Sequence, residues 1–340
     1  MRWPRAAAVA VILLGAMLAC ADPTLAPAPS SGNAAIFDAV WRDFDLNYSF
    51  FTLKGIDWDS VRAVVRPRAI AAPDDDALAR VIGGVLMSLH DRHVSLTTPA
   101  RTIAYQSAAD LAPAPFNPVL IDEDYLHEPT ITAGGRVIYG RVAPTIGYIR
   151  IPSFGGHGWV SDIDDAIAAL RGVRAMIVDV RENGGGTNEL AIAAAGRFAD
   201  ASRVFGYVRI RNGPAHDDFT GYIAETVAPS GPRQFRGPVI VLTNRKVYSS
   251  AEDFVLATRV LPNVTVVGDT TAGASGNPLV RELPNGWTFQ LSTWIEYTPA
   301  KRVFENIGLA PDIYVSSTMS QMIAGHDPMI DRAIQLAMGD

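Results

Sequence analysis

A serine stands where a buried strand would turn into a helix. The apolar run 239–242 is typical of a buried strand, and Ser249 opens a helical segment shortly after it. At the start of a helix the backbone N–H groups are unpaired and the helix dipole is positive, which suits a hydroxyl nucleophile that generates an oxyanion. A structural cap is the alternative, because Ser249 and Glu252 fit the S-x-x-E capping box.

A glycine-rich turn is the second candidate feature. Asn183 is followed by three glycines, after the apolar run 175–180 and before a helical segment. Glycines let the backbone turn sharply and present N–H groups to a ligand. The segment lacks the G-x-x-x-x-G-K-[ST] spacing of a phosphate loop. A ligand-binding turn and a plain structural turn therefore both remain open.

Histidines and acids complete the set of candidate residues. His90 and His93 are three residues apart, but no carboxylate or cysteine set with metal-ligand spacing accompanies them, so no metal is predicted. A general base needs one histidine, and His93 precedes a strand-like segment that would fix it. Glu305 and Asp312 lie in a loop with glycine and proline. A nucleophile, a histidine, an acid and a glycine turn are the components of an acyl-transfer site, although each also has an ordinary structural interpretation.

The N-terminus has the pattern of a targeting segment. Arg2 and Arg5 precede the apolar stretch 6–19, which is short for a membrane span of about 20 residues. Cys20, the only cysteine, follows directly in Met17-Leu-Ala-Cys20. This resembles a bacterial lipobox, in which the cysteine is lipidated; plain secretion is the alternative.

These features predict a protein of the bacterial cell envelope. We expect a signal peptide of lipoprotein type over 1–19 and a disordered Pro-, Ala- and Ser-rich tether over 20–32. The folded part would lie on the periplasmic side, held to the membrane through its N-terminal lipid. With one cysteine the chain forms no internal disulfide.

The remaining sequence predicts a small helical subdomain followed by an α/β domain. Apolar residues repeat at helical spacing in 33–100, whereas 101–134 has several prolines and no clear period, and is expected to be a connecting segment. Strands and helices alternate over 135–340, which is typical of an α/β layered core. Strands are expected over 137–142, 147–151, 175–180, 204–210, 239–242, 264–267 and 287–297, and helices over 161–170, 188–198 and 327–336.

Composition excludes one class of partner. The 340 residues carry a formal net charge of −6 and no basic stripe, so nucleic acid is not an expected partner.

In this order, the motifs resemble the C-terminal processing (tail-specific) serine peptidases, particularly the branch of the tricorn core and the interphotoreceptor retinoid-binding protein. The resemblance covers about residues 36–313. It rests on Val40-Trp-Arg-Asp-Phe44, Gly55-Ile-Asp-Trp58, Leu89-His-Asp-Arg-His-Val94, Ile146-Gly-Tyr-Ile-Arg-Ile-Pro-Ser-Phe154, Ile177-Val-Asp-Val-Arg-Glu-Asn-Gly-Gly-Gly186, Ser249-Ser-Ala-Glu252, Val267-Gly-Asp-Thr-Thr-Ala-Gly273 and Glu305-Asn-Ile-Gly-Leu-Ala-Pro-Asp312.

The resemblance implies a fold and a set of roles. It implies a crotonase/ClpP-like αβ core and a peptidase without metal or organic cofactor, acting on a protein or peptide. Ser249 matches the nucleophile and His93 the general base. Glu305 matches the acid that orients the site, through the histidine or through an intervening hydroxyl. The N–H groups of Ser250 and Gly185 match the oxyanion hole.

The sequence departs from the family pattern in three ways. Many members use a Ser-Lys dyad, but Ala274 stands at the lysine position. Arg92 precedes the histidine, where the tricorn core has a serine, so a fourth catalytic member is in doubt. Segment 101–134 is too short for the recognition (PDZ) domain of many members.

Two other functions remain open at this stage. The same fold can hold apolar ligands without catalysis, and Trp287 and Trp294 could line such a pocket, although tryptophans more often belong to the core. An esterase could use the same site. The deciding observation is whether Ser249, His93 and Glu305 converge.

Overall fold

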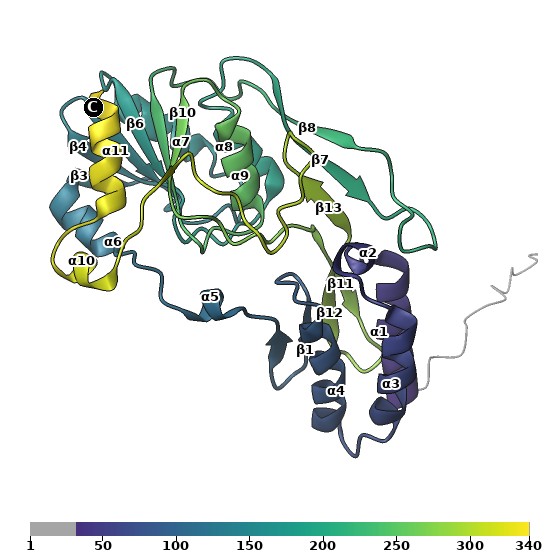
Figure 1. The fold of residues 1–340 in the computed structure, drawn as a ribbon. Helices are drawn as coiled ribbons and strands as arrows, with labels where there is room; N and C mark the ends of the chain where they lie inside the picture. The colour runs from purple at the N-terminus through teal and green to yellow at the C-terminus, as the bar shows by residue number, and fades with distance from the viewer. Residues whose placement is uncertain (1–31, 340) are drawn as a thin grey trace, which may run out of the picture.

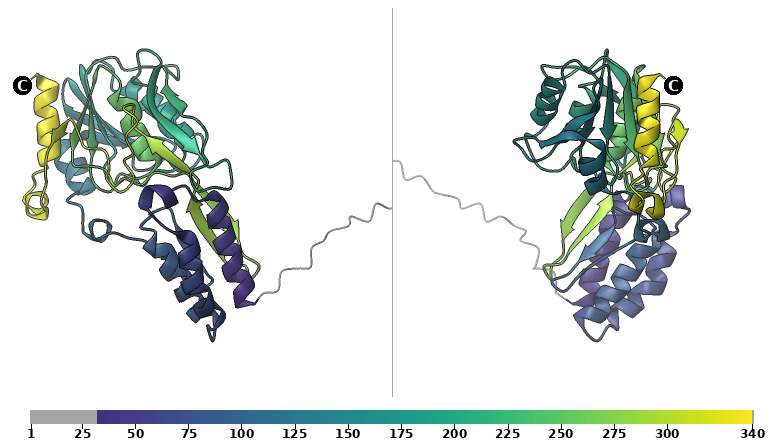
Figure 2. Two further views of the ribbon diagram at one scale, coloured as in Figure 1. Left: turned by 45° about the vertical axis from the view of Figure 1, so that its right-hand side comes forward. Right: turned by 90° about the vertical axis from the view of Figure 1, so that its left-hand side faces the viewer.

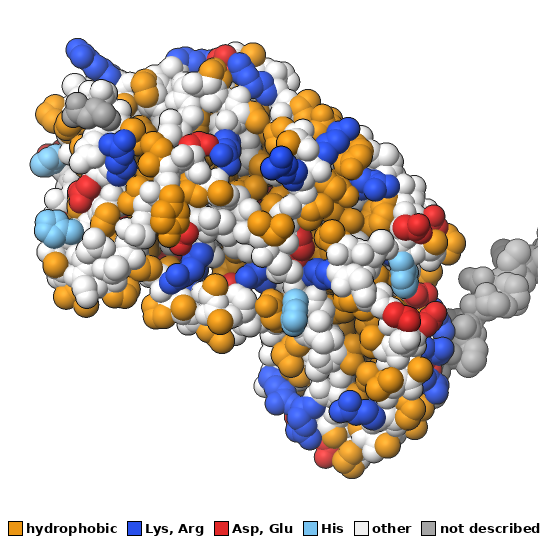
Figure 3. Space-filling view, viewed as in Figure 1, with side chains coloured by type: hydrophobic (Ala, Val, Ile, Leu, Met, Phe, Trp, Pro, Cys, Tyr) orange, Lys and Arg blue, Asp and Glu red, His pale blue; other side chains and the backbone are white. Residues whose placement is uncertain are grey.

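The computed structural model describes residues 32–339, so the expected signal peptide, almost all of the tether and Cys20 lie outside the described part. Two lobes are in direct contact, as the ribbon and the space-filling view both show (Figures 1 and 3). Within the described residues no helix is both long and apolar enough to cross a bilayer.

The larger lobe is built on a seven-stranded mixed sheet, which confirms the α/β prediction. Its inner strands are parallel, and the antiparallel strands β3 and β4 complete one edge. The order is β14 (Ile313–Tyr314), β10 (Val264–Gly268), β9 (Val239–Thr243), β6 (Ala175–Asp179), β5 (Ile146–Arg150), β4 (Ile138–Ala143) and β3 (His127–Ile131).

Helices cover both faces of this sheet because its strands are apolar on both sides. Met176 and Val178 pack in the cluster that holds α7 (Ser161–Ala169), α8 (Asn188–Ala195) and α9 (Ser250–Arg259). Ile177, between them in sequence, points to the opposite face, where α11 (Pro328–Met338) packs. Figure 1 shows α11 apart from α8 and α9.

A second, three-stranded sheet adds a further layer beyond α8 and α9. It has the order β13 (Trp294–Tyr297), β7 (Arg203–Ile210) and β8 (Ile223–Val227). Strand β7 contacts α9, and β8 contacts α8.

The smaller lobe is helical, as predicted, but it also contains strands. Four helices, α1 (Asn33–Asn47), α2 (Phe51–Lys54), α3 (Trp58–Ile70) and α4 (Asp75–Ser88), lie beside the four-stranded sheet β11 (Pro278–Glu282), β12 (Thr288–Ser292), β1 (Ser95–Thr97) and β2 (Thr102–Ala104). Figure 2 shows β11 and β12, from the C-terminal half, packed against the N-terminal helices. Phe289 and Leu291 of β12 share one apolar core with Phe44 and Trp58.

The predicted long strand over 287–297 is wrong. Strands β12 and β13 belong to different sheets and are separated at Thr293, whose N–H donates to the Gly276 carbonyl at 2.8 Å. The alternation continues through the break because Phe289 and Leu291 of β12 and Ile295 and Tyr297 of β13 face the same apolar core, so the pattern gives no sign that the chain changes sheets.

The segment predicted as a connection runs between the lobes with short elements only. They are β2, α5 (Ala108–Leu111), α6 (Pro118–Leu120), a π-helical turn (Ile121–Tyr125) and β3. The last helix before α11 is the short α10 (Met319–Ile323).

Candidate active site

Ser249 has an unusual backbone conformation at the start of α9. It lies at φ 53° and ψ −134°, a region that residues with a Cβ rarely adopt. Its N–H donates to the Ala274 carbonyl at 3.1 Å. Its Oγ has no hydrogen-bond partner in the described residues and borders a cavity of about 510 Å³. A half-buried serine is thus presented to a cavity by a strained turn.

The capping-box alternative is wrong. The Ser249 side chain caps no N–H of α9. The buried carboxylate of Glu252 accepts instead from Thr271 Oγ1 at 2.5 Å, Gly273 N at 2.8 Å and Ala274 N at 2.7 Å. Glu252 therefore ties α9 to the loop before β11. Burial raises the pKa of Glu252 to about 7, although these three hydrogen bonds lower it.

His93 borders the same cavity, and its ring has a defined tautomer. Nδ1 lies 2.8 Å from the Ser275 carbonyl oxygen, which can only accept, so Nδ1 carries the proton. Nε2 then has the free lone pair that a general base needs. The His93 backbone N–H donates to Asp91 Oδ1 at 2.8 Å, and Asp91 Oδ2 accepts from Ser292 Oγ of β12 at 2.8 Å.

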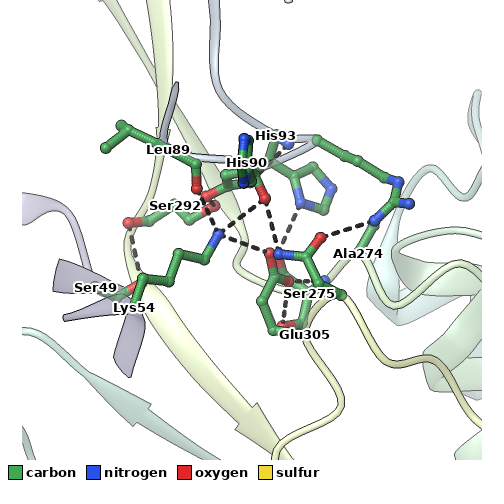
Figure 4. Close-up of polar contacts among 12 residues, drawn as sticks. Ser49, Lys54, Leu89, His90, His93, Ala274, Ser275, Ser292 and Glu305 are labelled. Atoms are coloured by element: carbon green, nitrogen blue, oxygen red, sulfur yellow. Dashed lines mark hydrogen bonds and ion pairs between the residues drawn. The ribbon is translucent and has the colours of Figure 1, made fainter. Parts of the chain in front are cut away.

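Glu305 reaches the histidine only through Ser275 (Figure 4). Its Oε2 accepts from Ser275 N at 3.0 Å and from Ser275 Oγ at 3.1 Å, while Oε1 lies 3.3 Å from Lys54 Nζ. Glu305 therefore has no direct contact with His93, and the link runs through the backbone of Ser275: its hydroxyl binds Glu305, whereas its carbonyl binds His93. Burial and the Asp91 carboxylate raise the pKa of Glu305 to about 8, while Lys54 and the Ser275 N–H lower it.

Two glycines lie close to the nucleophile. The Gly185 N–H donates to Asn183 Oδ1 at 2.8 Å, so the expected oxyanion donor already has an acceptor. Gly186 borders the cavity. Phe154 donates to the Gly185 carbonyl and accepts from the Thr187 N–H. Because successive backbone groups of an extended segment point to opposite sides, the Gly186 N–H points away from Phe154.

The Ser250 N–H, at the first position of α9, has no acceptor among the described residues. Like other N–H groups in a first helical turn, it is left for a ligand or for water.

A buried network of ion pairs, which joins residues just before the glycine turn to Asp327, holds the turn in place. Arg181 donates to Asp179 and to Asp327, with Nη–Oδ distances of 2.6 and 2.7 Å, and all three side chains are fully buried. Asp327 also caps α11. The turn that follows β6 is therefore fixed to the helix on the far face of the sheet.

The other sequence candidates have structural roles. The His90 carbonyl accepts from Lys54 and from Asn306. Asp312 Oδ2 accepts from the Val266 N–H at 2.9 Å. Arg92 is paired with Asp110, at 3.0 Å between Nε and Oδ2. Within residues 32–339 no group of three or more His, Cys, Asp or Glu is placed to hold a metal ion.

Sequence reasoning missed Ser275, Lys54 and Asp91. Ser275 directly follows Ala274, the position that corresponds to the family lysine, and no pattern in this loop indicates a role for its serine. Lys54 lies 251 residues before Glu305, and no local pattern indicates that the two side chains meet.

Comparisons with known proteins agree with this architecture. Residues 145–315 match peptidase family S41, and residues 32–86 match the tricorn protease C1 domain. The tricorn protease of Thermoplasma acidophilum is 27% identical over 222 residues, 64% of this chain and 19% of that protein. The carboxy-terminal processing protease CtpA of Bacillus subtilis is 28% identical over 170 residues, 49% of this chain and 34% of that protein. The chain thus spans only a fifth to a third of these relatives.

Solved structures extend the likeness over nearly the whole described chain. A candidate peptidase from Parabacteroides merdae has a TM-score of 0.81 and 34% identity, covering 90% of this chain and 97% of that one. The mature CPAF structure with lactacystin has a TM-score of 0.70 over 90% of this chain and 97% of that one, at 12% identity, which shows a shared fold. Together the family match and the 34% identical relative establish that the chain belongs to peptidase family S41.

Proposed function

We propose that this chain is a serine peptidase that hydrolyses peptide bonds through an acyl-enzyme at Ser249, with His93 as general base. The observation that carries the proposal is the pairing of an unpartnered Ser249 Oγ with a His93 ring whose Nδ1 is fixed on the Ser275 carbonyl. Both side chains border one cavity, and no direct hydrogen bond joins them. Such contacts commonly tighten only when substrate binds.

In the first half of the reaction, the hydroxyl proton of Ser249 would pass through His93 Nε2 to the nitrogen of the leaving amine. Ser249 Oγ attacks the substrate carbonyl carbon while His93 Nε2 takes the hydroxyl proton. His93 then gives that proton to the leaving amine as the carbon–nitrogen bond breaks. In the second half, His93 takes a proton from water, the hydroxide attacks the ester, and Ser249 regains its proton.

Backbone N–H groups would stabilise the negative oxygen of each tetrahedral intermediate. We assign one donor to Ser250, as the sequence indicated. We assign the other to Gly186 rather than Gly185, since the Gly185 N–H is held by Asn183 and the Gly186 N–H points away from Phe154. Removing one such donor typically costs about 10²–10³ in kcat.

Glu305 would act by positioning. Its carboxylate accepts from the N–H and the hydroxyl of Ser275, and the Ser275 carbonyl accepts from His93 Nδ1. Ser275 would thereby take the place of the serine that Arg92 replaces.

The N-terminal sequence supports a place for the enzyme in the cell envelope. We propose that Cys20 is lipidated and anchors the peptidase to a membrane on the periplasmic side. The support is the charged and apolar pattern before Cys20. Incorporation of labelled palmitate that persists in Cys20→Ser would contradict the anchor.

A fluorophosphonate probe tests the nucleophile directly. We expect the probe to label the wild-type protein and not Ser249→Ala, and peptide cleavage to be lost with labelling. A folded wild type that is never labelled would favour a non-catalytic binding protein. Cleavage of simple esters without cleavage of peptides would favour an esterase.

A further inference from the structure

Three carboxyl groups lie together beside the proposed nucleophile. Asp253 is on the first turn of α9, Glu296 on β13 and Glu225 on β8. Asp253 and Glu296 share a hydrogen bond, and Asp253 also interacts with Glu225. None of the three is used in the proposed chemistry.

The sheet β13-β7-β8 explains why the two glutamates face the same helix. Glu296 pairs with Val208, and Glu225 pairs with Gly206, two residues earlier on β7, so both side chains are on one face. Gly206 adds no side chain between them: a Cβ there would lie 3.7 Å from Glu225 Oε2. Asp253 approaches this face from α9.

None of these carboxyl groups has a compensating cation, although Asp253 and Glu296 are buried and Glu225 is half-buried. Asp253 and Glu296 are each 3% exposed, and Glu296 Oε1 has no hydrogen-bond partner. No ion pair in the described part of the chain includes any of the three. An uncompensated buried carboxyl costs stability, so this cluster is unfavourable unless something else fills the site.

The carboxyl groups border the cavity of the nucleophile and its extension. Asp253 and Glu296 border the cavity of about 510 Å³ together with Ser249 and His93. Glu225 borders a second cavity of about 480 Å³. The two cavities meet at four shared residues, Gly186, Asn188, Asn277 and Trp294.

The charged groups around these cavities are mostly acidic. The charge of Glu252 on α9 acts on Glu296, and the exposed Glu189 of α8 borders the second cavity. Among residues 32–339, Arg92 is the one arginine or lysine that borders either cavity, and it is already paired with Asp110.

We propose that Asp253, Glu296 and Glu225 form a specificity subsite that binds a cationic side chain, lysine or arginine, next to the scissile bond of the substrate. This rests on the proposed function, because the scissile bond is placed by Ser249. Asp253 is four residues from Ser249, about 6 Å along a helix axis. The four-carbon stem of lysine can span such a distance to present its ammonium group.

The cation would replace protons that the raised pKa values keep on these carboxyl groups. Burial raises the pKa of Asp253 to about 6, that of Glu225 to about 8 and that of Glu296 well above its usual value. Bound lysine favours the ionised carboxylates and therefore releases protons. Affinity for the cation should rise as the pH rises from 6 to 8.

A binding experiment tests the subsite without requiring turnover. Affinities of Nα-acetyl-lysine amide and of Nα-acetyl-norleucine amide are measured calorimetrically on wild type and on Ser249→Ala. We expect the lysine compound to bind about tenfold tighter or better, a difference of about 1.4 kcal/mol. Glu296→Gln and Glu225→Gln should each reduce this preference, while Glu282→Gln, which removes an exposed charge on β11, should not.

Failure of the subsite and failure of the peptidase are separable. Equal affinity for the two amides in wild type would overturn the subsite, whether or not the protein cleaves peptides. If the protein binds the lysine amide more tightly but is not labelled by a fluorophosphonate, the peptidase proposal is overturned and the proposal of a cation-binding subsite is retained. Where cleavage occurs, internally quenched peptides with lysine beside the cleaved bond should have kcat/KM at least about tenfold above those with norleucine.

Discussion

The conformation of Ser249 is the most costly local feature of the proposed site. A non-glycine residue in such a sparsely populated region costs about 1–3 kcal/mol and persists only when its surroundings enforce it. Three contacts do so: the Ser249 N–H bond to Ala274, the Ser249 carbonyl bond to the Glu252 N–H, and the Glu252 carboxylate on Gly273 and Ala274. The gain is a hydroxyl that points into the cavity instead of capping the helix.

His93 rather than a lysine should be essential. We expect His93→Ala to reduce the rate of acylation by about 10²–10⁴, the range for loss of a general base. Lys246→Ala and Lys301→Ala should leave it unchanged, since Lys246 Nζ has no polar partner among the described residues and Lys301 lies over the rings of Tyr207 and Tyr222. Burst kinetics with an activated ester measure acylation. Loss in either lysine variant would contradict the histidine-based scheme.

Lys54 should control the ionisation of Glu305. The pKa of Glu305 is already raised to about 8 by burial, and the neighbouring ammonium group is the main influence that lowers it. Lys54→Met removes this charge but keeps the apolar stem. If ionised Glu305 holds Ser275 and, through it, His93, the acid limb of kcat/KM should move to higher pH by about 1–3 pH units.

The control for this prediction is a variant that removes the titrating group. In Glu305→Gln the pH profile of kcat/KM should lack the acid limb that Lys54→Met shifts, and the value of kcat/KM at its plateau should be lower. An unchanged acid limb in Lys54→Met, in a protein with native melting behaviour, would show that Glu305 does not control the site through its charge.

At the scale of elements, the strand–turn–helix units could be predicted from sequence. The strands before Asn183 and Ser249 are apolar on both faces, and each is followed by a helix, as is typical of parallel strands. Because β6 and β9 are parallel, the turns after their carboxyl ends lie at the same edge of the sheet. The positions of Ser249, His93 and Glu305 followed from motifs. Their connection did not, because Ser275 and Lys54 come from segments that meet only when β11 and β12 join the N-terminal lobe.

The glycine turn should tolerate substitution at one position and not at another. A Cβ on Gly186 would lie 2.2 Å from Gly155 N and from the Phe154 carbonyl carbon, at a φ of +146°. A Cβ on Gly184 would meet no atom within 4 Å. We expect Gly186→Ala to destabilise the protein by about 3 kcal/mol or more, and Gly184→Ala to have little effect. Urea unfolding measures both, and equal stability of the two variants would contradict the close approach to Phe154.

At the scale of the whole molecule, the active site depends on both lobes. His93 and Lys54 come from the smaller lobe, while Ser249, Ser275 and Glu305 come from the larger one. Strands β11 and β12 leave the larger lobe and complete the core of the smaller one. Neither half of the sequence can therefore fold with a complete core or a complete site, because the predicted subdomain over 33–100 completes its core with strands from the predicted core over 135–340.

The buried acids make the stability of the whole protein depend on pH. The pKa values of Glu225, Glu252, Asp253 and Glu305 are all raised by burial, to about 8, 7, 6 and 8. A carboxyl group with a raised pKa holds its proton more tightly in the folded protein than in the unfolded chain. The contribution of these groups to the free energy of unfolding is therefore fully present below their pKa in the unfolded chain, near 4. It is lost as the pH rises through their folded-state pKa values of about 6 to 8.

Glu225→Gln tests this dependence, because glutamine has the same shape and does not ionise. At pH 5 wild-type Glu225 is protonated, so the variant should be about as stable as wild type. At pH 9 wild-type Glu225 must either ionise in its half-buried position or hold its proton at a cost, so the variant should be more stable by on the order of 2 kcal/mol. Urea unfolding at the two pH values measures the difference, and a gain that is equal at both would mean that Glu225 does not titrate in this range. Because a bound cation favours ionised carboxylates, Nα-acetyl-lysine amide should reduce the gain at pH 9, which links the stability of the fold to occupancy of the subsite.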